Sequence, residues 1–376
     1  MTMRSQLFAD PGTVVVKVGT NVLANAEGVL DRARIESLAS QIRSIRTRGW
    51  KVVLVSSGAI GAGVGKLNLG KRPTDLPHLQ ACAAVGQTAL MQIYQEALDP
   101  HGILPAQILL TAGDFDNRVR YLNVRNTILT LFEYGSLPII NENDTVAIAE
   151  IKFGDNDLLA AMVANLMRAE LLVLLTNVDG LYSADPGVDP TAKLLDTVPD
   201  IDADVAGLAG ATKSQLGTGG MRSKLKAARL ATSAGGAVIM ANGSNDGILE
   251  SVFAGDVVGT LFLPQTGATP AWKRWIGLTA RPKGSLLIDS GAKMALVQHG
   301  KSLLPVGVRE VVGDFGKGDL VSICDLHGAE FARGLSNYSA TEAAKLAGLN
   351  SEQMAERLGK VPYPELVHRD NLSVMS

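Results

Sequence analysis

The sequence predicts an α/β protein, in which a mainly parallel sheet has helices on both faces, followed by a smaller, mainly β domain. Strand-like apolar runs alternate with segments of helical periodicity between residues 14 and 262. Several of these runs are apolar on both faces, as buried parallel strands are. After residue 280 the pattern changes to short strands with frequent glycines. These three observations predict two domains of different architecture.

The first expected strand spans residues 14–18 and ends at Gly19. Asp31 is expected to cap a helix whose apolar residues fall on one face and which ends at Gly49. The other expected strands are residues 52–55, 106–110, 137–141, 171–176 and 237–241. The other expected helices are residues 79–98, 118–133, 155–169 and 221–234. Ligands of such sheets bind beyond the carboxyl ends of the strands, so functional residues are expected there.

The domain organisation follows from the change in pattern. We expect a large domain over residues 1–265, a linker over residues 266–280, and a second domain over residues 281–376. The strands expected in the second domain are residues 285–288, 321–323 and 331–334. This segment is too short to share the first core, so it is expected to fold separately.

Composition argues against nucleic-acid-binding, membrane, disulfide-rich and secreted proteins. The 376 residues carry a net charge of −2, which gives no overall attraction to nucleic acid or to an anionic membrane. Cys82 and Cys324 form neither a disulfide framework nor a metal-ligand spacing, so both are expected to be small buried residues in a reducing cytosol. No signal peptide is evident in residues 1–11, and the run 171–175 is too short to span a bilayer. A cytoplasmic protein without a membrane partner is expected.

Residues 216–224 read L-G-T-G-G-M-R-S-K and precede an apolar helical pattern. Glycines allow backbone N–H groups to face a ligand, a helix N-terminus adds partial positive charge, and Lys224 adds a full charge. The segment is therefore a candidate phosphate cradle, although it lacks the order of a Walker A loop. The alternative is a plain glycine-rich loop before a surface helix.

Lys17 lies within the first apolar strand, and a lysine is rarely buried unless it is paired. We expect its amine to meet a phosphate at the strand tip; the alternative is a lysine that reaches solvent from an edge strand. The small residues 56–63 follow the second strand, where backbone amides can approach a ligand closely. The alternative there is a tight turn with packing glycines.

Three polar segments follow later strands. Residues 141–144 (N-E-N-D) can bind the ammonium or carboxylate of an amino acid, and residues 154–157 (G-D-N-D) leave a carboxylate to orient a lysine or organise Mg²⁺. Residues 176–182 can hold a nucleoside. A solvated loop, a helix cap and a turn are the respective alternatives. Motifs of serine hydrolases, zinc proteases and protein kinases are absent, which favours phosphoryl transfer by positioning and charge neutralisation.

Taken together, these motifs resemble those of the glutamate 5-kinase family, which has the three-layer αβα amino acid kinase fold with a mainly parallel sheet. V-K-V-G-T at 16–20, S-S-G-A-I at 56–60, N-E-N-D at 141–144, F-G-D-N-D at 153–157 and the segment 216–224 occur in the family's order and spacing. The resemblance covers residues 14–263 and makes residues 1–265 the catalytic domain. The tail, residues 281–376, resembles a PUA domain.

The resemblance implies ATP-dependent phosphorylation of the side-chain carboxylate of L-glutamate, with Mg²⁺ as cofactor and no metal site made by the protein alone. Lys17 and Lys224 would contact the ATP phosphates, and Asp157 would hold both lysines. The implied glutamate-binding residues are Ser57, Gly58, Asp144 and Asn156. The implied ATP-binding residues are Lys17, Thr176, Asn177, Thr218, Gly219, Gly220, Met221, Arg222, Ser223 and Lys224. Many relatives carry aspartate and threonine where this chain has Asn177 and Ser223, which affects the expected nucleotide contacts rather than the reaction.

Alternative hypotheses about the substrate and about the tail remain. Aspartate, acetylglutamate, carbamate and uridylate kinases share the lysine and glycine elements, whereas residues 141–144 and 154–157, with the tail, favour free glutamate. PUA domains often bind RNA, but basic and acidic residues are equal in number over residues 281–376, so a structural or regulatory appendage is preferred. The resemblance further implies a homo-oligomer, dimer or tetramer, and proline as feedback inhibitor.

Overall fold

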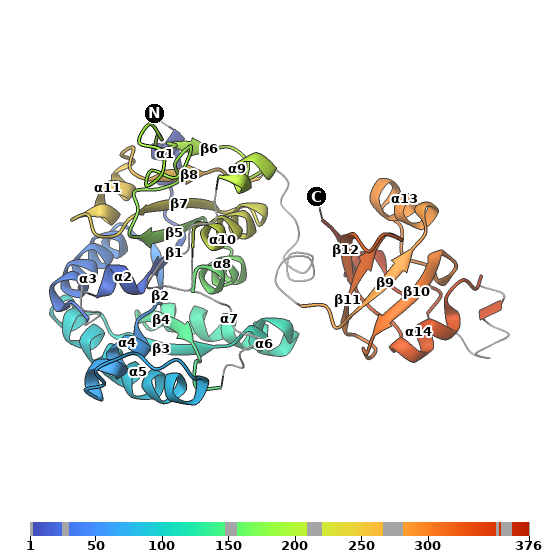
Figure 1. Ribbon diagram of the computed structural model, residues 1–376, viewed down its shortest axis with the longest axis horizontal. Helices are drawn as coiled ribbons and strands as arrows, with labels where there is room; N and C mark the ends of the chain where they lie inside the picture. The colour runs from blue at the N-terminus through green and yellow to red at the C-terminus, as the bar shows by residue number, and fades with distance from the viewer. Residues whose placement is uncertain are drawn as a thin grey trace. The chain divides into compact units, whose positions relative to one another are not determined.

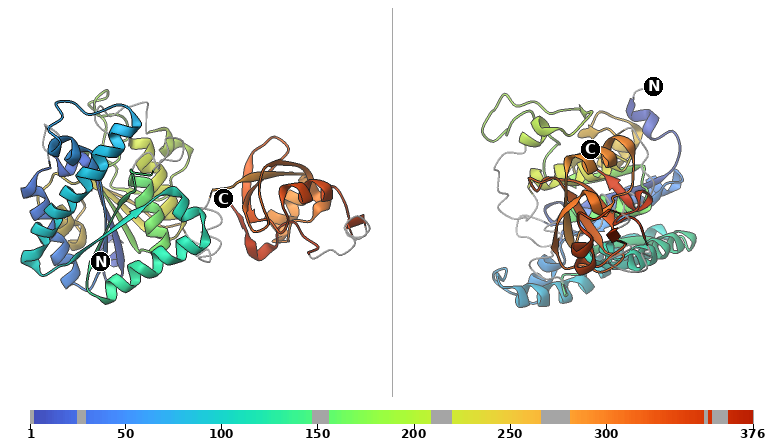
Figure 2. Two further views of the ribbon diagram at one scale, coloured as in Figure 1. Left: turned by 90° about the horizontal axis from the view of Figure 1, so that it is seen from below. Right: turned by 90° about the vertical axis from the view of Figure 1, so that its right-hand side faces the viewer.

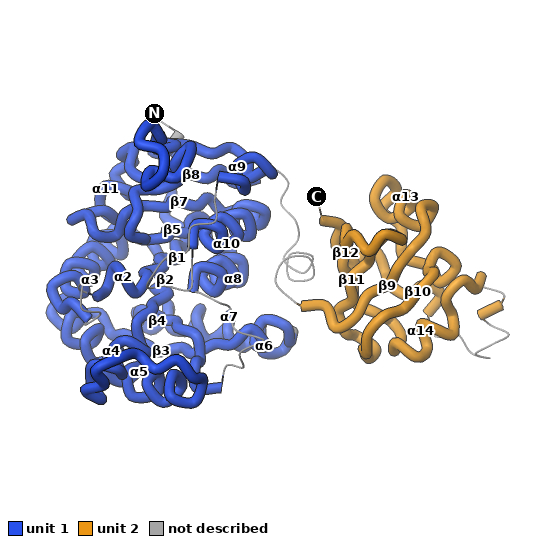
Figure 3. Tube along the Cα trace, viewed as in Figure 1, with its two compact units in different colours: residues 1–268 blue, residues 269–376 orange. Residues whose placement is uncertain are grey.

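The computed structural model describes residues 3–24, 30–146, 156–208, 220–265, 281–350, 353–354 and 363–375. The chain divides into two compact units, Met1–Ala268 and Thr269–Ser376, which Figure 3 shows in different colours. Residues 153–155, Thr218, Gly219 and the expected linker 266–280 lie outside the described residues.

The first unit contains, within the described residues, an eight-stranded sheet in the order β3-β4-β2-β1-β5-β7-β8-β6 (Figure 1). Among its described strands, neighbours are parallel except β7 and β8, which are antiparallel. The strands are β1 (Thr13–Val18), β2 (Lys51–Ser56), β3 (Pro105–Leu110), β4 (Leu137–Glu142), β5 (Leu171–Thr176), β6 (Thr197–Val198), β7 (Ala237–Asn242) and β8 (Thr260–Phe262). The predicted mainly parallel sheet is confirmed, and β1 lies inside it, between β2 and β5.

Helices cover both faces of this sheet, as the left-hand view of Figure 2 shows. One face carries α3 (Arg32–Thr47), α5 (Leu76–Leu98) and α11 (Ile248–Ala254), and the other carries α7 (Arg118–Glu133), α8 (Asn156–Met167) and α10 (Met221–Ser233). The shorter helices are α1 (Met3–Leu7), α2 (Thr20–Leu23), α4 (Ala59–Lys66), α6 (Ala112–Asp116), α9 (Ala203–Gly207) and a 3₁₀ turn at Asp99–His101. This is the predicted three-layer αβα arrangement.

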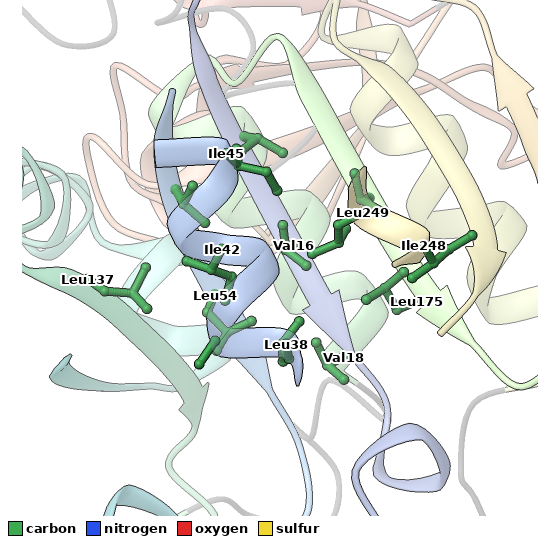
Figure 4. Packing of buried hydrophobic residues seen from close by; sticks show 14 of the residues in the cluster. Val16, Val18, Leu38, Ile42, Ile45, Leu54, Leu137, Leu175, Ile248 and Leu249 are labelled. Carbon is green, nitrogen blue, oxygen red and sulfur yellow. The ribbon is translucent and has the colours of Figure 1, made fainter. Parts of the chain in front are cut away.

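The core of the first unit forms where α3 packs on the sheet. Leu38, Ile42 and Ile45 of α3 lie against Val16 and Val18 of β1 (Figure 4). All five are at most 6% exposed. Burying such a side chain fully stabilises a fold by roughly 1.5–3 kcal/mol relative to leaving it in water. As predicted, the carboxylate of Asp31 caps α3, accepting from the backbone N–H of Arg34 at 3.3 Å. The central strands are therefore held firmly.

The glycine-rich segment after β2 forms helix α4, which was not predicted. Glycine disfavours helix formation in isolation, but here it permits close packing on α5. A Cβ on Gly63 would lie 1.8 Å from the Cys82 carbonyl oxygen, and a Cβ on Gly86 would lie 1.8 Å from the Ala59 carbonyl oxygen. The backbones of α4 and α5 thus touch, and this contact fixes the first turn of α4.

The second unit has, in its described part, a five-stranded sheet in the order β10-β9-β11-β12-β13. Its elements are β9 (Gly284–Ile288), α13 (Ser290–His299), a 3₁₀ turn (Pro305–Gly307), β10 (Val308–Gly313), β11 (Leu320–Cys324), β12 (Glu330–Leu335), α14 (Ala340–Leu346), a 3₁₀ turn (Arg369–Asn371) and β13 (Leu372–Val374). The three expected strands correspond to β9, β11 and β12, whereas β10, β13 and the two helices were not predicted. Apolar residues of its own, including Leu286, Ile323 and Leu366, form its core.

Two expectations from composition can be compared with the structure. Cys82 and Cys324 are both buried, and neither is in a disulfide. Among the described helices, none combines the length and the apolar character needed to cross a membrane.

The contact between α4 and α5 predicts a large effect of a single methyl group at Gly86. We expect Gly86→Ala to lower the free energy of unfolding by about 1–3 kcal/mol, because overpacking forces the two helices apart. Urea denaturation followed by circular dichroism measures this. Gly65→Ala is the matched control, since a Cβ there has nothing within 4 Å, and it should stabilise by at most about 1 kcal/mol. A Gly86→Ala protein as stable as wild type would contradict the proposed contact.

Candidate active site

A cavity of about 260 Å³ lies where the segments after β1, β2, β4 and β5 meet. This is the carboxyl edge of the parallel sheet, where functional residues were expected. The residues that line the cavity are Lys17, Gly19, Thr20, Asn21, Val22, Ser57, Gly58, Ala59, Ile60, Gly61, Arg72, Leu79, Asn141, Glu142, Asp144, Asn156, Asp157, Leu175, Thr176, Asn177 and Lys224. Polar and charged side chains from distant parts of the sequence therefore share one space.

Two lysines in this cavity share one buried carboxylate. The Nζ atom of Lys17 on β1 lies 2.5 Å from Oδ1 of Asp157, and Nζ of Lys224 lies 2.8 Å from Oδ2. Asp157 is in the first turn of α8 and Lys224 is in the first turn of α10. The exposed fractions of the three side chains are 7% for Lys17, 1% for Asp157 and 11% for Lys224. Because β1 is inside the sheet, the alternative of an edge-strand lysine is wrong.

The ionisation of Asp157 is set by opposing influences. Its burial acts to raise the pKa of the carboxyl group. The charges of Lys17 and Lys224, together with the hydrogen bonds they donate, outweigh burial and hold the pKa below the ordinary aspartate value. Asp157 is therefore ionised at neutral pH, and two positive charges face one negative charge. The cluster keeps a net positive charge beside the cavity, which suits an anionic ligand.

Two helices that supply residues to the lining of this cavity have a glycine as N-cap. Gly220 precedes α10, and Gly58, at a φ of 102°, precedes α4. Only glycine adopts such a positive φ without strain, and it contributes no side chain that could cap the first N–H groups. Residues 59–61 of the first turn of α4 line the cavity. The first N–H groups of both helices are thus suited to binding an anion.

A hydrogen-bonded amide joins the ends of β2 and β4 to α8. The Nδ2 atom of Asn156 donates to the carbonyl oxygen of Ser56 at 2.7 Å, to Oγ of Ser57 at 2.9 Å and to Oδ1 of Asn141 at 2.8 Å. Asn141 is 3% exposed. These contacts hold the side chains of Ser57 and Asn156 together at one side of the cavity.

The structure brings most of the described candidate residues together in the lining of the cavity. The lining residues among them are Lys17, Ser57, Gly58, Asp144, Asn156, Asp157, Thr176, Asn177 and Lys224. Thr176, the last residue of β5, is 4% exposed, and its hydroxyl donates to Oδ1 of Asn177 at 3.3 Å. Gly220, Met221, Arg222 and Ser223 form the N-cap and first turn of α10 without lining this cavity. Thr218 and Gly219 lie outside the described residues.

Sequence reasoning missed several residues at or near the cavity. Arg72, in the connection between α4 and α5, lines the cavity and has no ion-pair partner among the described residues. Leu79 of α5 provides an apolar wall. Gln87, also on α5, hydrogen-bonds to Asn141 at 2.9 Å. No motif marks these positions, because only the packing of α4 and α5 brings them to the site.

Comparisons with known proteins agree with this geometry. The family model described as "Amino acid kinase family" matches residues 12–242, and the model described as "PUA domain" matches residues 284–358. The glutamate 5-kinase of Caldanaerobacter subterraneus subsp. tengcongensis is 45% identical over 362 residues, covering 96% of this chain and 97% of that protein. The glutamate 5-kinase of Pelobacter propionicus is 45% identical over 373 residues, covering 99% and 100%. That of Trichlorobacter lovleyi is 46% identical over 374 residues, covering 100% of both chains.

Relatives at this identity extend over practically the whole chain, including the C-terminal unit. The resemblance found in the motifs, the amino acid kinase fold and the PUA domain are all confirmed. The chain belongs to the amino acid kinase family, and within it to the glutamate 5-kinases.

Proposed function

We propose that this chain transfers the terminal phosphoryl group of ATP to the side-chain carboxylate of L-glutamate. The product is L-glutamyl 5-phosphate, and the reaction is the first step of proline biosynthesis. The observation that carries the proposal is the cluster of Lys17, Asp157 and Lys224 at the edge of a cavity with separate groups for an amino acid. The glutamate 5-kinase relatives align with the whole chain, which supports the same reaction.

The chemistry asks for charge neutralisation rather than for a general base. A side-chain carboxylate has a pKa of about 4, so the attacking group is already ionised at neutral pH. The obstacle is repulsion between this carboxylate and the triphosphate, about 4 kcal/mol per charge pair at ~4 Å and an effective dielectric constant of 20. The ammonium groups of Lys17 and Lys224 offset this repulsion and stabilise the transferring group. Asp157 holds both ammonium groups close together.

The remaining residues divide between the two substrates. Ser57, Gly58, Asp144 and Asn156 are proposed to bind glutamate, the Asp144 carboxylate being suited to the α-ammonium group. The proposed nucleotide-binding residues are Lys17, Thr176, Asn177, Thr218, Gly219, Gly220, Met221, Arg222, Ser223 and Lys224. Supporting this division, the glutamate group lies after β2 and β4, whereas Thr176 and Asn177 follow β5.

Mg²⁺ is proposed to enter with ATP, as part of the nucleotide substrate. No cluster of three His, Cys, Asp or Glu side chains that could hold a metal ion is found within the described residues. Mg²⁺ in kinases is typically held by substrate phosphates and one or two carboxylates. Glu142 is a carboxylate that lines the cavity, and it fits such a role. The ion would neutralise part of the phosphate charge.

Further properties are proposed from the resemblance. Residues 1–265 are taken as the catalytic domain, residues 266–280 as a linker and residues 281–376 as the PUA domain, with a structural or regulatory role. Proline is proposed as a feedback inhibitor and a dimer or tetramer as the assembly, in the cytoplasm.

The direct test is the trapping of an acyl phosphate as hydroxamate. Purified protein is incubated with ATP, Mg²⁺ and hydroxylamine, and glutamate, aspartate and acetylglutamate are compared side by side. We expect ATP- and Mg²⁺-dependent hydroxamate with glutamate alone. Hydroxamate formed with another acid would show that this acid is the substrate, and the proposed mechanism of phosphoryl transfer would still apply. Folded protein that is silent with all three acids would contradict the proposed function.

Removal of one lysine should impair turnover without loss of the fold. We expect Lys224→Ala to lower kcat by about a hundredfold or more, the range seen when one group that stabilises transition-state charge is removed. Asp157 keeps Lys17 as a partner in this variant, so thermal unfolding should change little. Lys226→Ala is the matched control, because Lys226 is exposed on the same helix. Wild-type turnover in Lys224→Ala would exclude its proposed role.

The proposed glutamate contact of Asp144 predicts a selective effect on one substrate. We expect Asp144→Ala to raise the KM for glutamate by about tenfold, since a charged hydrogen bond to the ammonium group is lost. The KM for ATP should change much less. Initial rates with each substrate varied in turn measure both constants. An equal rise of both would argue against the assignment.

A further inference from the structure

The side-chain amides beside the proposed glutamate site form a chain of hydrogen bonds, in which each amide donates to the next. The direction of donation along this chain decides which atoms face the cavity. The two ends of an asparagine or glutamine amide have the same shape, but one end accepts hydrogen bonds and the other donates them. Asn156, Asn141 and Gln87 are linked end to end by such groups. If one amide turned over, its neighbours would have to turn as well.

Two backbone groups fix this direction, because a backbone N–H only donates and a backbone carbonyl only accepts. The N–H of Glu142 donates to Oδ1 of Asn141 at 2.9 Å. Nδ2 of Asn141 therefore points the other way, to Oε1 of Gln87 at 2.9 Å. At the far end, the carbonyl oxygen of Ser56 accepts from Nδ2 of Asn156 at 2.7 Å. Each amide thus has one allowed orientation.

The direction of the chain decides what the cavity offers to a substrate. Nδ2 of Asn156 is engaged by the Ser56 carbonyl oxygen, Ser57 Oγ and Asn141 Oδ1. Within the described residues, Oδ1 of Asn156 therefore remains to accept from a ligand. Ser57 Oγ accepts from Asn156, so its own hydrogen remains to be donated. An acceptor suits the α-ammonium group of an amino acid, and a donor suits its carboxylate.

We propose that Gln87 is a positioning residue that holds this arrangement through Asn141. Gln87 is the described partner of Asn141 Nδ2, and Asn141 is 3% exposed, so water does not replace it readily. Gln87 itself does not line the cavity. Without an acceptor at position 87, the buried Nδ2 of Asn141 loses its partner Gln87. If the Asn141 amide turned over instead, its Nδ2 would face Nδ2 of Asn156, and two donors would meet. Either change disturbs Asn156 and Ser57. This inference rests on the proposed function, because it concerns how glutamate is recognised.

Three variants of α5 test the proposal. Gln87→Met keeps the length of the side chain but removes the acceptor, whereas Gln87→Glu keeps an acceptor for Asn141 Nδ2. Gln92→Met is the matched control on the same helix, since Gln92 is exposed and bonds to Glu96. We expect Gln87→Met to raise the KM for glutamate about tenfold, the cost of leaving one buried amide unpaired, with little change in the KM for ATP. Gln87→Glu should lie closer to wild type than Gln87→Met does, and Gln92→Met should equal wild type.

A second measurement asks whether Gln87 acts through Asn141. In an Asn141→Leu background, Gln87→Met should add no further rise in the KM for glutamate, because the linking amide is already gone. Additive effects of the two changes would overturn the proposed route.

The remaining outcomes each decide a different point. A wild-type KM for glutamate in Gln87→Met, or Gln87→Glu as impaired as Gln87→Met, would overturn the role of Gln87. Equal rises in both KM values with a lower unfolding temperature would assign Gln87 a merely structural role and overturn the proposal too. If the wild-type protein phosphorylated another acid in place of glutamate, the proposed function would be wrong, whereas the role of Gln87 would still be undecided. The same variants, measured with that acid, would still decide the role of Gln87.

Discussion

The arrangement of this catalytic unit depends on one buried carboxylate. Asp157 joins three elements that are far apart in the sequence, because its two oxygens bind Lys17 of β1 and Lys224 of α10. Removing this carboxylate would be strongly destabilising, since the buried ammonium groups of Lys17 and Lys224 would lose the counter-charge that they share. Because its pKa is lowered in the folded protein, Asp157 contributes stability that is fully present above the unfolded value of about 3.9 and is lost as the pH falls through the folded value. The same contact that organises the charges thus supports the fold over the neutral range.

The order of the strands makes this contact possible. β1 lies between β2 and β5, so the segments that follow these strands reach the same edge of the sheet. The apolar faces of the strands are covered by α3 on one side and by α8 and α10 on the other, which leaves the carboxyl edge as the place for polar groups. A lysine within β1 is tolerated because the first turn of α8 supplies its counter-charge.

Much of this could be predicted from local sequence, and the parts that could not have a common cause. Continuous apolar runs such as residues 171–176 identify buried parallel strands, and glycines before Lys224 mark a helix start that can bind phosphate. Helix α4 was missed because its glycines disfavour a helix locally and are explained only by the contact with α5. Arg72 and Gln87 reach the site through that same packing. A residue that reaches the site only through tertiary packing has no recognisable pattern in the nearby sequence. A buried strand or a helix N-terminus does have such a pattern, so it can be predicted.

The two cysteines give each unit its own internal reporter. Cys82 lies in α5 of the first unit and Cys324 ends β11 of the second, and both thiols are buried. Burial, with the nearby Glu330 and Asp325, also raises the pKa of the Cys324 thiol. A thiol reagent can reach either sulfur only after the surrounding structure opens, because both thiols are buried. The rate at which each cysteine is modified therefore reports the local opening of one unit independently of the other, in an intact chain and without any engineered label.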